Sequence, residues 1–454
     1  MSRWTLCVLL CVSIPACAKG MSLPRDLDRD GAARRDGGPA LGPIDASACD
    51  GCAAPTDPDC DPRCGTDAGV STAGDASVAP ADTGAAPADA APSPGDAGAD
   101  AEPCAGRPWE VEVVPTMAPV ELGRGIGLAV DARGGAHVAV VVDSDGPASP
   151  YVTLRYGYRS PSGEWRFEDV TSATSSMASL SVALDATSRV HVAWMVGGGG
   201  VRHAVRDARG AWTIESVGDA DGGAPVLTAG ADGALHLAFL TYAGAEPRPR
   251  YARRASDAEP WVIESIDDPR FRSTYAPGMA LDAAGEPHLC YTTSTTLPGD
   301  PFELHYARHR GGAWEVRSLG VATFGSYRCS LALAASGEAH LIFADVDGGI
   351  SHAHGVDGTW QTSSIASDPR GLGAHVRVEP ETGVLHVVYE SGSALHAGTR
   401  RLAGEWRWEL VTDEPHQGYD TALALDPAGL PRVAFLDDPG VPGQARYAAA
   451  GACP

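Results

Sequence analysis

The stretch GIGLAVDARGGAHVAVVV, residues 125–142, decides the fold because it recurs along the chain. By itself it predicts two apolar β-strands around a glycine-containing turn, with one histidine at the start of the second strand. A close copy, SLSVALDATSRVHVAWMV, occupies residues 179–196, and five more follow. The aligned positions lie 45 to 54 residues apart and are His137, His191, His236, His288, His340, His386 and Arg432. Short strands at this period are typical of β-propeller blades.

Each repeat predicts the same four strands. The first is typified by LAVD, the second by HVAW, the third by VRHAVR, and the fourth begins at a tryptophan, as in GAWTIESV. A glycine stands three residues before the aligned position in six of the seven copies: Gly134, Gly233, Gly285, Gly337, Gly383 and Gly429. Only glycine enters a positive-φ turn without steric cost, so these residues are expected to set the first hairpin.

The two ends of the repeat array predict how the ring closes. A lone fourth-strand motif, RPWEVEVV, precedes the first copy at residues 107–114, whereas the seventh copy stops after its third strand. We expect strand 108–114 to complete the last blade, so that no sheet edge stays open. This pairing would bring Cys104 beside Cys453, and we expect a disulfide there. The sequence therefore predicts an all-β, seven-bladed propeller of four-stranded antiparallel blades over residues 104–454.

The remaining cysteines allow several interpretations. Cys290 stands in a second strand and Cys329 at the first strand of the next blade, so they form either a disulfide or two buried thiols. A cluster of four more lies far upstream, at Cys49, Cys52, Cys60 and Cys64. Two local disulfides are favoured over a zinc site, because zinc modules usually separate their cysteine pairs by a longer segment. A calcium loop through the nearby aspartates is disfavoured by Pro58 and Pro62.

The amino terminus predicts export. Residues 1–17 combine Arg3, an apolar run and small residues, which is typical of a signal peptide. The residues IPAC favour a lipobox with lipidation of Cys17, and ACA at residues 16–18 is the alternative cleavage site. Residues 18–103 are rich in Asp, Ala, Gly and Pro and predict a disordered linker. We expect a cell-envelope location, as an outer-membrane lipoprotein or a secreted protein, with membrane contact only through the lipid anchor.

Charge and composition limit the partners. The formal net charge of -24 argues against nucleic-acid binding. Lys19 is the only lysine, and this composition indicates a GC-rich bacterial genome. The sequence offers no spaced set of metal ligands and no phosphate-cradling loop, so no metal and no cofactor are predicted. A monomer is expected.

The repeats resemble a known family. The pattern D-x-x-G-x-x-H followed by aliphatic, small and aromatic residues, with a later tryptophan, is similar to sialidase-like BNR or Asp-box propellers of exported bacterial proteins. The linker resembles that of myxobacterial surface lipoproteins. The resemblance implies a propeller over about residues 105–454. An intact Asp box is missing from every copy, with remnants at Asp207 and Asp357, and seven blades exceed the six usual in sialidases. These departures argue against sialidase activity.

Residues that recur in every blade are expected to be structural. A group repeated around a ring serves each blade equally, whereas catalysis needs groups that converge on one point. We expect each aligned histidine to satisfy a backbone group beside its hairpin turn and the tryptophans to pack between blades. The turn acids are expected to accept backbone hydrogen bonds: Asp131, Asp185, Asp282 and Asp426.

Residues that break the repeat are better candidates for a site. Tyr275, Tyr327 and Tyr419 each stand thirteen residues before an aligned position, so all three are expected at one mouth of the ring. Charged neighbours accompany them: Arg270, Arg272, Arg328, His416 and Asp420. Aromatic rings with flanking polar groups suit sugar or peptide recognition. The alternative is that the tyrosines only pack the mouth as a further repeat feature.

The sequence therefore predicts a surface binding or scaffold module for a glycan or protein ligand at the propeller mouth. No catalytic residue is predicted. A sialidase-like glycoside hydrolase and an envelope assembly protein are the alternatives.

Overall fold

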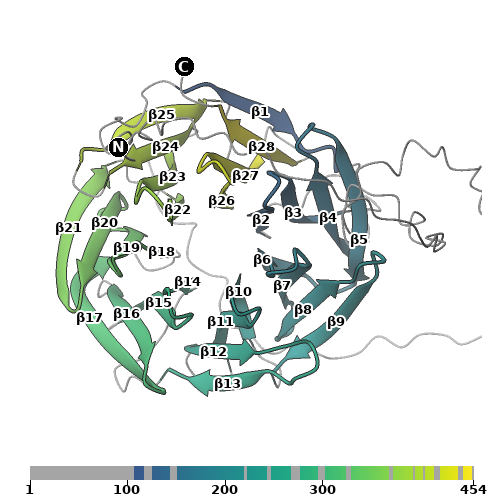
Figure 1. The fold of residues 1–454 in the computed structure, drawn as a ribbon, viewed down its shortest axis with the longest axis horizontal. Coiled ribbons are helices and arrows are strands. Elements are labelled where there is room, and N and C mark those ends of the chain that lie inside the picture. Colours follow the sequence, from purple (N-terminus) through teal and green to yellow (C-terminus); the bar gives the residue numbers. More distant parts are fainter. Residues whose placement is uncertain are drawn as a thin grey trace, which may run out of the picture. The chain divides into compact units, whose positions relative to one another are not determined.

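The structure is a seven-bladed β-propeller, as the repeats predict. This computed structural model describes residues 107–116, 125–143, 151–218, 222–242, 247–266, 277–294, 302–323, 329–367, 372–391, 394–401, 404–413, 420–437 and 443–451. These residues form strands β1–β28 in seven antiparallel four-stranded sheets, with no helix among them. Figure 1 shows the sheets arranged as a ring, with the first strand of each blade nearest the centre. The signal segment, the linker and its cysteines lie outside the described residues.

The strands follow one order in every blade. Blade 1 is β2 (Ile126–Val130), β3 (Ala136–Val142), β4 (Val152–Arg159) and β5 (Trp165–Ala173). Blade 2 is β6 (Met177–Leu184), β7 (Val190–Val196), β8 (Val201–Arg206) and β9 (Trp212–Val217). Blade 3 is β10 (Gly222–Ala229), β11 (Leu235–Thr241), β12 (Arg248–Arg254) and β13 (Val262–Ser265). Blade 4 is β14 (Gly278–Leu281), β15 (Pro287–Thr293), β16 (Phe302–Arg310) and β17 (Ala313–Thr323).

The remaining blades repeat this order. Blade 5 is β18 (Ser330–Leu333), β19 (Ala339–Ala344), β20 (Ile350–Val356) and β21 (Thr359–Ala366). Blade 6 is β22 (Leu372–Val378), β23 (Leu385–Ser391), β24 (Ala394–Arg400) and β25 (Arg407–Thr412). Blade 7 is β26 (Thr421–Leu425), β27 (Pro431–Asp437), β28 (Gln444–Ala450) and β1 (Trp109–Val113).

Strand β1 closes the ring. It pairs antiparallel with β28, from Trp109 opposite Ala450 to Val113 opposite Arg446. Beyond the strand, Gly451 N donates to Pro108 O at 2.8 Å. The first and last strands of the propeller thus share one sheet, which leaves no blade with a missing edge strand. Cys104 and Cys453, the expected closing disulfide, lie outside the described residues.

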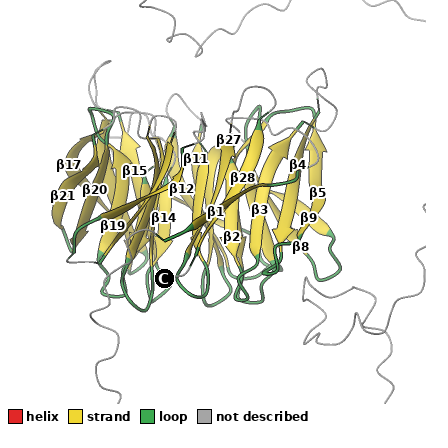
Figure 2. Cartoon of the chain, turned by 90° about the horizontal axis from the view of Figure 1, so that it is seen from above, coloured by secondary structure: helices red, strands yellow, loops and turns green. Residues whose placement is uncertain are grey.

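Glycines set the first hairpin of each blade. All six glycines expected there have positive φ, for example +88° at Gly134 and +69° at Gly383. In blade 2 the same position is Ser188, whose φ is 62°. The turn acid completes the hairpin, because Asp131 Oδ1 accepts from the amides of Arg133 and Gly135 at 2.8 Å. Figure 2 shows these turns gathered at one end of the ring, which we call the hairpin end; the opposite end is the loop end.

Apolar side chains from neighbouring blades form the core. Every residue of β3, AHVAVVV, is buried, because both faces of each sheet are covered by adjacent blades. One cluster joins blades 1 and 2 through residues such as Leu154, Val192 and Trp194. Six similar clusters lie at the other blade interfaces. Burial on both faces explains the nearly continuous apolar runs of the second strands.

A tryptophan–glutamate hydrogen bond links most neighbouring blades. Trp165 Nε1 donates to Glu112 Oε1 of the preceding blade at 2.9 Å, and Trp212 Nε1 donates to Glu168 Oε1 at 2.7 Å. Equivalent pairs are Trp261–Glu215, Trp314–Glu264 and Trp109–Glu409. The sequence carries this signal as Trp-x-x-Glu, which the sequence analysis missed. We call this contact the interblade clamp.

The clamp is missing at two interfaces. Arg317 and Ser363 replace the glutamate, and the indole nitrogens of Trp360 and Trp406 have no hydrogen-bond partner among the described residues. Between blades 4 and 5, a disulfide joins Cys290 to Cys329 with Cα atoms 6.1 Å apart. Gly278 makes room for it, because a Cβ there would lie 2.5 Å from Cys329 O and 2.9 Å from Cys290 Sγ. A covalent bond thus spans one of the two interfaces without a clamp.

Candidate functional site

The aligned histidines are held inside their own blades. His137 Nδ1 shares a hydrogen bond with Tyr156 Oη at 2.6 Å, and its Nε2 lies 3.3 Å from Asp131 Oδ2. His236 and His288 contact Tyr251 and Tyr306 in the same way. In blades 2 and 5 a histidine replaces the tyrosine: His191 pairs with His203, and His340 with His352. The expectation of a backbone partner is therefore corrected, because the ring nitrogens bind side chains while the turn acid satisfies the backbone amides.

Burial keeps several of these imidazoles neutral. It lowers the pKa of His236 to about 4 and of His340 to about 4. It also lowers the pKa of His203, even though the hydrogen bond to Glu215 opposes this. On the acid side, burial alone would raise the pKa of Asp131, but hydrogen bonds from His137 and the turn amides hold it below its usual value. Each aligned histidine thus has at least one side-chain partner inside its own blade, which supports a structural role. Three ring nitrogens have no hydrogen-bond partner among the described residues: His236 Nε2, His340 Nε2 and His386 Nδ1.

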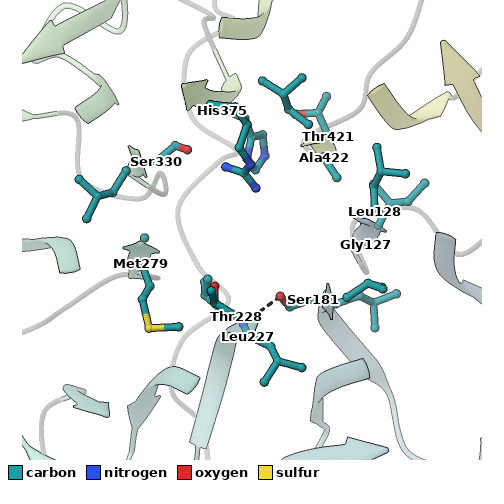
Figure 3. A pocket seen from close by; sticks show the side chains of 18 of the residues that line it. Gly127, Leu128, Ser181, Leu227, Thr228, Met279, Ser330, His375, Thr421 and Ala422 are labelled. Carbon is teal, nitrogen blue, oxygen red and sulfur yellow. Dashed lines mark hydrogen bonds between the residues drawn. The ribbon is translucent and has the colours of Figure 1, made fainter. Parts of the chain in front are cut away.

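The described residues enclose a cavity along the central channel. The first strands of all seven blades line a cavity of about 120 Å³, and Figure 3 shows labelled side chains such as Ser181, Thr228 and His375 around its open centre. A wider cavity of about 650 Å³ adjoins it at the hairpin end. The lining is mostly small or apolar, with a few hydroxyl groups and two basic side chains, His375 and Arg377. Polar atoms contribute at least as much of the exposed channel surface as apolar atoms do.

Asp420 and Thr421 together connect three blades at the loop end of this channel. Its Oδ2 accepts from Gly125 N of blade 1 at 3.1 Å, and its carbonyl accepts from Leu436 N of blade 7 at 3.1 Å. The next residue, Thr421, donates from Oγ1 to Gly373 O of blade 6. Asp420 thus occupies a fixed position where blades 6, 7 and 1 meet.

Glu390 is the functional candidate that the sequence analysis missed. It lies in β23 and is 6% exposed, and its Oε1 has no hydrogen-bond partner among the described residues. Burial, aided by the negative charge of Asp420, raises the pKa of Glu390 to about 9. Gly373 packs against the side chains of Glu390 and Thr421. A Cβ at this position would lie 3.4 Å from Glu390 Oε1 and 3.0 Å from Thr421 Oγ1. A neutral carboxyl group in the second strand of blade 6 therefore lies within the electrostatic influence of Asp420.

The sequence does contain a signal for Glu390. It stands four residues after the aligned His386, where the other blades have Val141, Met195, Leu240, Thr292, Ala344 and Leu436. A lone acid at a position that is otherwise apolar or threonine breaks the repeat, as a site residue would.

Of the predicted site residues, only Asp420 is described. Tyr275, Tyr327, Tyr419, Arg272, Arg328 and His416 lie outside the described residues, as do Arg270 and Cys17. Each tyrosine precedes a described residue by two positions in the sequence, and these residues are Pro277, Cys329 and Thr421. All three line the channel cavity. The chain positions that follow the tyrosines therefore converge on one channel.

Two kinds of feature are absent from the described part of the chain. It contains no group of three or more His, Cys, Asp or Glu side chains arranged to hold a metal ion. Nor does it contain a helix long and apolar enough to cross a membrane.

Comparisons with known proteins find similar solved structures but no sequence relatives. No family model matches the chain, and no curated protein matches its sequence. Similar solved structures include an ulvan lyase, a polysaccharide lyase, with TM-score 0.49 and 13% identity over 75% of this chain and 96% of that chain. A lectin from Aleuria aurantia has TM-score 0.46 and 14% identity over 66% of this chain and 100% of that chain. A protein of unknown function from Dyadobacter fermentans has TM-score 0.46 and 12% identity over 61% and 94%.

Similarity at this level carries no argument about ligand or activity. The function is therefore inferred from the residues of this chain.

Proposed function

We propose that this protein is an exported cell-envelope lipoprotein whose propeller binds a glycan at the loop end of its central channel. The observation that carries the proposal is the carboxyl group of Glu390, buried near Asp420 with an Oε1 that has no hydrogen-bond partner among the described residues. A neutral carboxyl donates and accepts hydrogen bonds, whereas a carboxylate only accepts. Sugar hydroxyl groups need both kinds of partner, so this pair suits a polyhydroxylated ligand.

The three tyrosines extend this proposed site. Aromatic rings stack on the apolar faces of sugar rings while flanking polar groups bind the hydroxyls. Tyr419 directly precedes Asp420, and Tyr275 and Tyr327 precede channel-lining residues by the same two positions. Arg272, Arg328 and His416 would supply further hydrogen-bond donors. The support for a role of these residues is their position in the sequence.

The proposed cell-envelope location is supported by the amino-terminal sequence. The apolar run after Arg3 and the IPAC residues favour lipidation at Cys17, and the long acidic segment that follows suits a tether. A tethered propeller with a ligand site would act as a surface binding module.

A glycan array with the mature chain tests the binding function. We expect binding that weakens ~10- to 100-fold in Asp420→Ala and in a Tyr275, Tyr327 and Tyr419 triple alanine variant, because each loses hydrogen bonds or stacking. Asp207→Ala is the matched control, because Asp207 accepts turn hydrogen bonds from Arg209 and Ala211 at the hairpin end. No bound glycan would contradict the proposal and leave a protein partner as the better candidate.

Glu390 also supports a second candidate function. Glycoside hydrolases use a protonated carboxyl group as acid and a second carboxylate as base or nucleophile, and Glu390 and Asp420 offer that chemistry. The Glu390→Gln variant separates the two functions, since the amide keeps hydrogen-bonding capacity but cannot transfer a proton. A binding module keeps glycan affinity in this variant and shows no turnover in either form. Hydrolysis of a bound glycan by the wild type, lost in Glu390→Gln, would identify an enzyme.

A further inference from the structure

Arg377 breaks the repeat at the wall of the central channel. It lies in β22 opposite His386. The residues opposite the aligned position in the other six blades are small, namely Ala129, Ala183, Thr228, Ala280, Ala332 and Ala424. Six small residues and one arginine at equivalent positions place a single positive charge on one side of the channel. The packing of a blade does not require it, since the other six blades form the same hairpin without it.

Arg377 lines two adjoining cavities and has few partners in the described part of the protein. Arg377 lines both the cavity at the channel centre and the wider cavity at the hairpin end. Its one hydrogen bond among the described residues runs from Nη1 to the carbonyl of the neighbouring Val376, at 2.8 Å. Within that part of the chain it forms no ion pair, in contrast to Arg155, Arg206 and Arg308, each of which lies within 2.7 Å of a carboxylate. Most donors of the guanidinium group therefore have no hydrogen-bond partner among the described residues.

The acidic residues that line the wider cavity already have partners other than Arg377. Asp232 lies 3.0 Å from Arg253 Nη2, and Asp282 accepts from the amides of Ala284 and Glu286 at 2.8 and 2.9 Å. Burial lowers the pKa of Arg377, and no acid offsets this effect. Arginine nevertheless stays charged in proteins, so the channel contains a cation whose solvation is incomplete.

We propose that Arg377 binds an oxyanion inside the central channel, either an inorganic anion such as sulfate or phosphate or the carboxylate of a small organic acid. The planar guanidinium group binds such anions through two parallel hydrogen bonds. Thr228, which lines both cavities, supplies a hydroxyl donor beside the same space. The cavity of about 120 Å³ exceeds the ~10–15 Å³ that one water molecule needs, so a small anion fits. This site goes beyond the proposed glycan function and does not depend on it.

The test compares the mature chain with Arg377→Met, which keeps the length of the side chain and removes its charge. Isothermal titration calorimetry with sulfate, phosphate, acetate and glucuronate in a low-salt buffer measures binding. We expect at least one of these anions to bind the wild type and to bind Arg377→Met ~10- to 100-fold more weakly, because hydrogen bonds to a charged group are lost. Binding of sulfate or phosphate identifies an inorganic ligand, and binding of only acetate or glucuronate identifies an organic acid.

Thermal unfolding provides a second readout. In the absence of added anion, Arg377→Met is expected to match or exceed the melting temperature of the wild type, since it removes an uncompensated buried charge. Added anion should then stabilise the wild type more than the variant. The matched control is Arg253→Met, which loses an exposed ion pair and should respond to anions as the wild type does. Equal anion responses in wild type and Arg377→Met, or a variant that is less stable under every condition, would overturn the proposal.

Discussion

At the scale of single residues, buried titratable groups control stability. Five buried histidines have a lowered pKa: His203, His236, His288, His340 and His352. Glu390 is the opposite case, with a pKa raised to about 9. The histidines remain neutral in the fold at pH values where the unfolded chain already binds protons. Glu390 instead remains protonated in the fold where the unfolded chain has lost its proton.

These shifts predict a maximum of stability near pH 7, because the unfolded histidines are still half protonated at their ordinary pKa of about 6.5. Below this value the unfolded chain binds protons at five histidines, which outweighs the single proton kept by Glu390, so the free energy of unfolding falls as the pH drops toward about 4. Above about pH 7.5 the histidines are largely neutral in both states, and Glu390 lowers stability as the pH rises toward about 9. Calorimetric melting temperatures across this range check the prediction. Glu390→Gln should remove the alkaline decline and leave the acid decline, and a flat profile would contradict both assignments.

At the scale of the structural element, the interblade clamp is the distinctive contact. Glu215 illustrates its strength, because it accepts from Trp261 Nε1 at 3.0 Å and also contacts His203 and Arg254. Burial alone would raise the pKa of Glu215, but these hydrogen bonds and the nearby Arg254 charge lower it to about 2. Two tryptophans, Trp360 and Trp406, have no such acceptor among the described residues.

The clamp predicts opposite effects at two equivalent positions. Glu168→Ala is expected to cost ~1–3 kcal/mol of stability, because Trp212 and Arg206 both lose a charged acceptor. Ser363 is the equivalent position in blade 5, so Ser363→Glu should stabilise the protein by giving Trp406 an acceptor. Ser363→Ala is the control and should have little effect. Chemical denaturation measures the free energy of unfolding of all three variants. An unchanged value in Glu168→Ala would show that packing alone holds the blades together.

At the scale of the whole molecule, closure of the ring depends on β1. Its register with β28 and the hydrogen bond between Gly451 and Pro108 bring the two ends of the propeller together. A closed ring has no open sheet edge, so loss of β1 would expose β28 along its length.

We predict that a disulfide between Cys104 and Cys453 locks this closure. Non-reducing peptide mapping of the mature chain should show the two cysteines in one linked peptide pair, alongside the Cys290–Cys329 pair as an internal reference. A Cys104→Ser and Cys453→Ser double variant should melt at a lower temperature, because the cross-link restricts the unfolded chain. Free thiols at both positions in the wild type would refute the lock.

The predictions from the sequence succeeded where a signal repeats. Seven copies of one hairpin pattern determine the number of blades, and the six hairpin glycines have the positive φ expected of them. The lone Trp109 strand likewise pairs with the last blade. Period and alternation depend only on neighbours along the chain, so they can be read without coordinates.

The two proposed sites depend on residues that occur once, and a residue that occurs once has no period in the sequence. Sequence reasoning identified Asp420 from its tyrosine neighbour but missed Glu390 and Arg377, whose environment comes from other blades. Burial of Glu390 near Asp420, and the position of Arg377 against an open channel without an ion pair among the described residues, follow from how seven sheets pack around one axis.

The sequence by itself thus determined the repeating blade, because local periodicity specifies strands and turns. Only the tertiary structure decided which unique side chains share the channel, since charge and burial depend on distances between segments far apart in the chain.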